Sequence, residues 1–360
     1  MSLSRAVRSV LIFTMTMLIA GCGTGYTPSN NPPPMAARFM FVANLFSNTI
    51  SSYTVDPQTG QLAAKDTIPA GGTHPRAIAA EPSGHYAYVG NLVTSDISVF
   101  TVDTNTGSLA MAGSTVATGG GPRSLLVGPT GDFLYSVNQD SNTVSMFAIN
   151  SNTGALISMG DVPTDDVPVA ISFHPEGQFA YVANALSNDL TIYGVDGAGG
   201  LRLLGATPVG ENPASISMHP SGRFAYVLNL GASDLAIFSV NAATGGLTLL
   251  APRIPAGAGP TSLTLDSQGR FAYVTDNLSG SVSVFAVDAV TGSLTATSSA
   301  PVGANPVALS LDPSGRFAYV ANFGSDDITQ FTVDPRTGAL APIGSPANAG
   351  TGPVSLAFTK

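Results

Sequence analysis

A pattern of alternating large and small residues recurs seven times along the chain. In FAYVAN at 317–322, aromatic and aliphatic residues alternate with small ones, and a polar turn follows. The copies are spaced 47, 47, 46, 45, 47 and 46 residues apart, and they begin at Arg38, His85, Asp132, Gln178, Arg223, Arg270 and Arg316. Alternation with a period of two predicts β-strands, and a constant spacing of this length predicts one repeated structural unit.

Each unit contains four strand signals separated by turns, which we name A to D in chain order. In the last complete unit these are PVALSLD (306–312), FAYVAN (317–322), ITQFTVD (328–334) and the weaker outer strand ALAPIG (339–344). Four antiparallel strands in about 40–50 residues are typical of a β-propeller blade. A β-helix has shorter repeats, and a sandwich does not repeat. We therefore predict an all-β, seven-bladed β-propeller.

The two ends of the repeat pattern predict how the ring closes. The first unit begins directly at strand B and lacks a strand A, whereas GPVSLAF (352–358) supplies an extra strand A at the other end. We expect this C-terminal strand to pair with residues 39–44 and to complete blade 1, which removes the open sheet edge.

Two further regularities concern the packing of the blades. Strand A pairs a large residue with a small one before it, as in Ala77–Ile78, so neighbouring blades can approach closely near the axis. The turn between strands C and D repeatedly ends in glycine, which adopts a positive φ without steric cost. These glycines are Gly60, Gly107, Gly154, Gly292 and Gly338.

The N-terminal segment resembles a bacterial lipoprotein leader. Arg5 and Arg8 precede the apolar stretch VLIFTMTMLIA (10–20), which is too short to span a membrane comfortably, and small residues lead to Cys22. The resemblance implies a signal peptide at 1–21, lipidation of Cys22, a Pro-rich tether at 22–37 and the propeller at 38–360. It places the protein in the cell envelope, held to the membrane only by the lipid, at the outer membrane in a Gram-negative cell, facing the periplasm or exterior. The alternative is an ordinary signal peptide with a chance cysteine.

Composition limits the possible partners and chemistry. Charged residues make up 10% of the chain, against about 25% on average, and the net charge is −9. With 13 Lys and Arg scattered along the chain, nucleic-acid binding is not expected. The single cysteine excludes an intrachain disulfide. We expect a monomer without cofactor or metal.

The repeated motifs resemble a known family. SNTISSYTVDPQTGQL (47–62) and PSGRFAYVAN (313–322) are similar to the YVTN repeats of the lactonase family of seven-bladed propellers, which includes the bacterial propeller-type 6-phosphogluconolactonase. The resemblance covers residues 38–360 and implies a lactone (carboxylic ester) hydrolase. The chain departs from the family where GPRS (121–124) carries Ser124 in place of histidine and where Asn138-Gln139-Asp140 replaces a typical NEL.

The D–A loops carry the residues that we expect to act on a ligand, because propellers usually bind ligands where such loops surround the channel. Arg76 and Arg123 suit the binding of an acid and the stabilisation of an oxyanion, and His74 suits the activation of water. We expect further ligand contacts from Asp165, Asp166, Glu211 and Asp276. The structural alternative is that the arginines hold loop carbonyls and that the acids pair with arginines.

Repeated polar residues at the end of strand B are expected to serve turn chemistry. An asparagine side chain can bond nearby backbone and tolerates a left-handed φ. The positions are Asn44, Asn91, Asn138, Asn184, Asn229, Asp276 and Asn322.

Two functional hypotheses remain open at this point. The first is a hydrolase that opens a sugar lactone at the channel mouth. The second is a non-catalytic, envelope-anchored propeller that binds a glycan, a peptide or a protein.

Overall fold

The computed structural model describes residues 38–359. The signal peptide, the tether and the lipidation of Cys22 predicted above lie outside the described residues.

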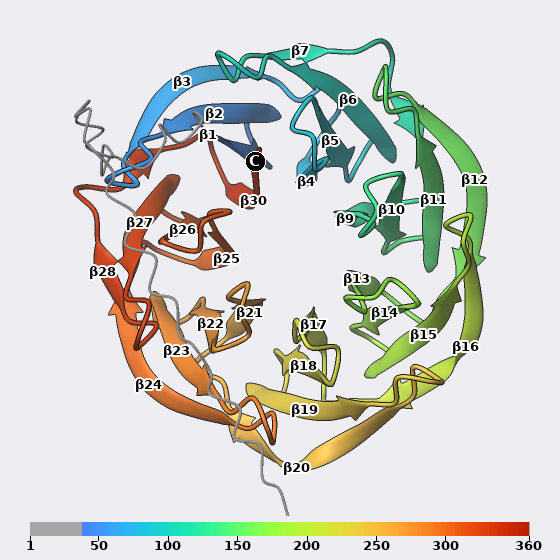
Figure 1. Cartoon of the computed structure of the whole chain (residues 1–360). Helices are drawn as coiled ribbons and strands as arrows, with labels where there is room; N and C mark the ends of the chain where they lie inside the picture. Colours follow the sequence, from blue (N-terminus) through green and yellow to red (C-terminus); the bar gives the residue numbers. More distant parts are fainter. Residues whose placement is uncertain (1–37, 360) are drawn as a thin grey trace, which may run out of the picture. The chain divides into compact units, whose positions relative to one another are not determined.

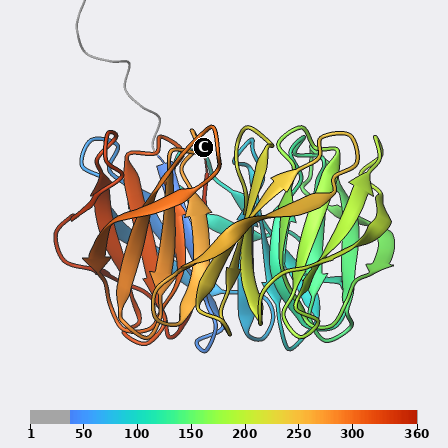
Figure 2. The same ribbon diagram turned by 90° about the horizontal axis from the view of Figure 1, so that it is seen from below.

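The described chain forms seven antiparallel sheets arranged in a ring, as Figure 1 shows, which confirms the predicted β-propeller. Blade 1 has the strand order β3-β2-β1-β30, and blade 4, for example, has the order β13-β14-β15-β16. Seen from the side in Figure 2, the strands run between two faces. Because the strands are antiparallel, the A–B and C–D turns share one face, and the B–C turns and D–A loops share the other.

The strands keep their A-to-D roles in every blade. The A strands are β4 (Pro75–Ala80), β9 (Pro122–Val127), β13 (Pro168–Phe173), β17 (Pro213–Met218), β21 (Pro260–Leu265), β25 (Pro306–Leu311) and β30 (Pro353–Phe358). The B strands are β1 (Arg38–Asn44), β5 (Tyr86–Asn91), β10 (Phe133–Asn138), β14 (Phe179–Asn184), β18 (Phe224–Asn229), β22 (Phe271–Asp276) and β26 (Phe317–Asn322). The C strands are β2 (Thr49–Val55), β6 (Asp96–Val102), β11 (Thr143–Ile149), β15 (Asp189–Val195), β19 (Asp234–Val240), β23 (Ser281–Val287) and β27 (Asp327–Val333).

The outer D strands vary most. Five blades have one continuous D strand: β3 (Leu62–Pro69), β12 (Leu156–Pro163), β16 (Leu201–Pro208), β20 (Leu247–Pro255) and β24 (Leu294–Pro301). In blade 2 the D strand is divided into β7 (Leu109–Met111) and β8 (Val116–Ala117). In blade 7 it is divided into β28 (Leu340–Pro342) and β29 (Ala347–Asn348). The weak strand predicted at 339–344 therefore corresponds to β28, and β29 lies beyond the predicted range. Outer strands have one neighbour only, so their pairing tolerates such interruptions.

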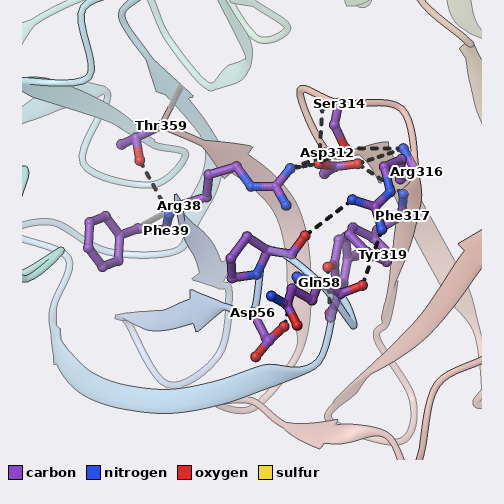
Figure 3. A network of polar contacts seen from close by, with 12 residues as sticks. Arg38, Phe39, Asp56, Gln58, Asp312, Ser314, Arg316, Phe317, Tyr319 and Thr359 are labelled. Atoms are coloured by element: carbon purple, nitrogen blue, oxygen red, sulfur yellow. Dashed lines mark hydrogen bonds and ion pairs between the residues drawn. The ribbon is translucent and has the colours of Figure 1, made fainter. Parts of the chain in front are cut away.

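The ring closes as the sequence predicts. β30 pairs with β1 in the register Met40 with Phe358 and Val42 with Leu356, which joins the two ends of the described chain within blade 1. A second contact across the closure joins Arg38 to the buried carboxylate of Asp312 in blade 7, drawn in Figure 3. Strand pairing and this ion pair therefore connect blade 7, blade 1 and the C-terminal strand.

The core lies between neighbouring blades, and the C–D glycines are part of it. A Cβ atom on Gly107 would overlap the ring of Phe39 in the preceding blade, and φ there is 69°. The same arrangement recurs at Gly60, Gly154, Gly199, Gly245, Gly292 and Gly338. Six strand-B tyrosine hydroxyls also donate to the carbonyl oxygens of these glycines at 2.6–3.1 Å. Each buried ring contributes about 2 kcal/mol through burial, so the blade interfaces hold the ring together.

Within residues 38–359, no helix is long and apolar enough to cross a membrane.

Candidate functional site

A cavity of about 260 Å³ lies at the channel, and every blade contributes to its wall an equivalent residue of strand A. Each is the second residue of a strand A, directly after the proline with which that strand begins. These residues are Arg76, Arg123, Val169, Ala214, Thr261, Val307 and Val354. Because strand A begins at the D–A face, this ring lies near the mouth that the D–A loops surround. Its two charged members come from adjacent blades.

The two arginines leave positive charge uncompensated in the cavity. Of the four ion pairs formed within residues 38–359, none involves Arg76 or Arg123. Arg123 donates a hydrogen bond to Oε1 of Gln139 at 3.1 Å. Burial, with a smaller contribution from the charge of Arg123, lowers the pKa of Arg76 to about 10. Burial also lowers the pKa of Arg123. Both guanidinium groups remain charged at neutral pH, so the cavity attracts anions.

The rest of the cavity wall is neutral. Serines from four blades line it, namely Ser124, Ser215, Ser262 and Ser355. Two of them accept backbone hydrogen bonds from the next blade, Ser355 from Ile78 at 3.2 Å and Ser215 from Leu263 at 3.4 Å. This agrees with the predicted packing of small residues of strand A against large ones. None of the described residues that line this cavity is Asp, Glu or His.

His74 lies outside the cavity wall. Its backbone has a left-handed φ of 56°, its N–H donates to Oδ1 of Asn48 at 2.7 Å, and its ring packs edge-on to Phe46 with centroids 6.0 Å apart. The structure therefore does not bring His74 to the surface where Arg76 and Arg123 meet, although only Pro75 separates it from Arg76 in the sequence.

The three acidic loop residues also lie apart from the arginines. Asp165 lines a different cavity, toward outer strand β16, and Thr191 donates to it at 3.4 Å. Asp166 is exposed and accepts a hydrogen bond from Asn142 at 3.0 Å. Glu211 is exposed, and its backbone carbonyl accepts from the N–H of Gly231 at 3.0 Å. Each of these loops bonds to a neighbouring B–C turn.

Asp276 occupies a structural position. Its side chain is 1% exposed, and Ser283 donates to its Oδ2 at 2.6 Å. Its Oδ1 has no hydrogen-bond partner among the described residues. Burial raises the pKa of this carboxyl to about 6. Asp276 is not among the residues that line the cavity with the arginines.

The six asparagines equivalent to Asp276 join strands and loops, but not as we predicted from the sequence. Their amides donate mainly to side chains of strand C, as in Asn44 to Ser51 at 2.9 Å, and some carbonyls accept from a D–A loop, as in Gly350 to Asn44 at 3.2 Å. The left-handed φ occurs later in the turn, for example 55° at Asn48. The predicted local backbone bond is therefore wrong, because the buried amide reaches two other segments.

The comparisons with known proteins agree with this architecture. The family model described as Lactonase, 7-bladed beta-propeller, matches residues 35–121, 78–173, 116–262 and 252–358. The chain belongs to this lactonase family. No curated protein matches the chain.

Solved structures share the fold of this lactonase-family propeller. A candidate 6-phosphogluconolactonase from Bacteroides fragilis is 20% identical with a TM-score of 0.81, over 92% of this chain and 100% of that one. A protein from Lactobacillus plantarum is 22% identical with a TM-score of 0.80, over 91% and 100%. The periplasmic gluconolactonase of Pseudomonas aeruginosa is 20% identical with a TM-score of 0.77, over 90% and 99%.

Sequence reasoning missed the ring of seven channel residues, although the signal was present. Every strand A begins with proline, and the next residue faces the channel in all seven blades. Comparing that position across the repeat isolates Arg76 and Arg123 as the only charged members of the ring, and it excludes His74, which precedes the proline.

Proposed function

We propose that this lactonase-family propeller hydrolyses a sugar lactone in the channel cavity. The observation that supports this is the pair formed by Arg76 and Arg123 in an otherwise neutral ring. Lactone hydrolysis develops negative charge on the carbonyl oxygen and ends in a carboxylate. Two uncompensated guanidinium groups stabilise both, and preorganised charge of this kind is usually the largest contribution to catalysis.

In the proposed reaction, a water oxygen bonds to the lactone carbonyl carbon while the carbonyl oxygen takes up negative charge beside the arginines. The ring C–O bond then breaks, the ring oxygen receives a proton from the attacking water, and a hydroxy acid leaves. Since no Asp, Glu or His of residues 38–359 lines the cavity, we assign the activation of water to no side chain. Removing one oxyanion donor from such a site reduces kcat about 10²–10³-fold.

Two considerations favour an unphosphorylated lactone. The N-terminal sequence predicts export, and phosphorylated sugar lactones are rarely available outside the cytosol. The solved Pseudomonas aeruginosa structure is described as a periplasmic gluconolactonase. We also propose that the protein is held in the cell envelope by a lipid on Cys22.

The test is hydrolysis of glucono-1,5-lactone by the purified full-length protein, followed by acid release in a pH-stat and corrected for spontaneous hydrolysis. We expect Arg76→Gln and Arg123→Gln to lower kcat/KM by about 10²-fold or more. The matched control is Arg223→Gln. Arg223 lies over the ring of Phe224 at the start of a strand B, on the face of the propeller opposite to the channel mouth. Wild-type hydrolysis no faster than in buffer would refute the proposal.

A second candidate function is binding without catalysis. It is favoured because the part of the chain that the structure describes places no carboxylate or imidazole in the cavity wall. In that case an envelope sugar acid, or an acidic group of a larger glycan or protein partner, occupies the arginine site. Calorimetric titration with gluconate distinguishes the two candidates. Binding that Arg76→Gln abolishes, in the absence of any lactone hydrolysis, supports the second candidate.

A further inference from the structure

Two phenylalanines stand at the tips of neighbouring B–C turns on the face of the channel mouth. Phe46 follows strand β1 in blade 1 and is 55% exposed, and Phe323 follows strand β26 in blade 7. Large aromatic side chains are usually buried, so an exposed ring that packs on a second aromatic ring at this face suggests a binding surface.

These rings and His74 form one cluster, which we call the aromatic platform. The ring centroids of Phe46 and Phe323 are 5.3 Å apart, and those of Phe46 and His74 are 6.0 Å apart. Gly352 lies beneath them with φ 70°, and a Cβ atom there would lie 3.1 Å from both phenylalanine rings. The platform therefore combines side chains from blades 1, 7 and 2 around a position that favours glycine.

Short chain segments connect the platform to the wall of the arginine cavity. Phe46 donates its N–H to the carbonyl of Thr351 at 3.0 Å, so this turn is fixed to the D–A loop that leads into strand β30. Val354 of that strand lines the cavity. In blade 2, only Pro75 separates His74 from Arg76, which also lines the cavity. The platform is thus connected through short chain segments to residues of the cavity wall in blades 1 and 2, one of which is Arg76.

Sugar rings present a face of C–H groups as well as hydroxyl groups, and aromatic rings pack against such apolar faces. In a ligand that joins a sugar ring to an acid or lactone group, the sugar ring suits the platform and the acid or lactone group suits the arginines. We propose that the platform binds the second sugar ring of a glycosylated aldonolactone, so that a disaccharide lactone is preferred over a monosaccharide lactone. This inference rests on the proposed function for the placement of the lactone group.

An exposed apolar residue at another B–C turn, outside any aromatic cluster, provides a matched control. Leu186 is 67% exposed at the corresponding turn of blade 4, and no aromatic ring pair includes that turn among the described residues. Leu186→Ala removes a similar apolar area on the same face of the propeller. It should leave both substrates unaffected.

The experiment compares cellobiono-1,5-lactone with glucono-1,5-lactone as substrates of the full-length protein, and cellobionate with gluconate as ligands in calorimetry. We expect Phe46→Ala to lower kcat/KM and affinity for the disaccharide compounds about three- to tenfold, the usual effect of one aromatic contact. The monosaccharide values should change less than twofold. Circular dichroism and the melting temperature show whether the variant is folded.

Each outcome decides between the two proposals. Equal kcat/KM for both lactones, or an equal loss of kcat/KM on both after Phe46→Ala, overturns the proposal that the platform binds a second sugar ring and leaves the lactonase proposal in place. Binding of cellobionate that depends on Phe46, without hydrolysis of either lactone, supports the platform and overturns the lactonase proposal. Absence of all binding together with absence of hydrolysis overturns both. If light scattering shows a dimer, and Phe46→Ala makes the protein monomeric, the sugar-binding proposal for the platform is overturned. A second copy of the chain would then cover the platform.

Discussion

Asp276→Asn should stabilise the propeller at neutral pH. In the folded chain, burial raises the pKa of this carboxyl from 3.8 to about 6. This rise in the pKa corresponds to a cost on the order of 3 kcal/mol for the charged form in the folded state. An amide at this position carries no charge and can donate to Ser283, as the equivalent Asn44 donates to Ser51.

The raised pKa of Asp276 determines how the stability of the fold changes with pH. Between pH 3.8 and about 6 the folded state of Asp276 binds more protons than the unfolded state, so stability falls as pH rises through this window. Above it, the wild-type chain carries the full cost of the buried charge. The gain from Asp276→Asn is therefore greatest at pH 7–8 and disappears below about pH 4. For a domain of this size, about 3 kcal/mol corresponds to a rise of about 4 °C in Tm.

The assay is the melting temperature and urea midpoint of both proteins at intervals between pH 4 and pH 8. Asn322→Asp provides the reverse control, since Asn322 holds the equivalent position in blade 7 and donates to Asp327 and Thr329 at 2.6 and 2.8 Å. It should lower stability at pH 7, because it places a second carboxylate beside that of Asp327. A shift for Asp276→Asn that is the same at pH 4 and pH 8, or a loss of stability at pH 7, would refute the reasoning.

Three further predictions concern packing, ring closure and location. Gly107→Ala should destabilise the fold by more than about 2 kcal/mol, measured by urea unfolding, because the new methyl group would overlap Phe39 at a positive φ. Arg38→Met should cost about 3–5 kcal/mol in the same assay because it leaves the Asp312 carboxylate buried without its cation, and Arg38→Met combined with Asp312→Asn should recover part of the loss. Cys22→Ser should move the protein from the membrane fraction to the soluble periplasmic fraction on fractionation of cells, whereas an unchanged distribution would contradict the lipid anchor.

Most of the architecture could be predicted because it depends on local rules that the chain repeats. Alternation along FAYVAN-like segments specifies a strand with a buried face, and a constant spacing specifies equivalent blades. The missing strand A of blade 1 and the surplus strand at 353–358 predicted the closure that β1 and β30 form. Positive φ at Gly60 and Gly338 also followed from turn chemistry.

The site depended on contacts between segments far apart in the sequence, and there the prediction was incomplete. His74 and Arg76 are separated by one residue, yet strand β4 begins between them. The ring of His74 therefore packs on Phe46, while the side chain of Arg76 lines the channel. Asp276 follows the asparagine pattern, but its burial depends on how the loop before β21 packs over it, as does the lack of a partner for its Oδ1 within residues 38–359. A repeat in the sequence determines what each blade is, because local backbone preferences recur with it. Only the closed ring decides which side chains from different blades meet, because those distances are set by packing around the axis.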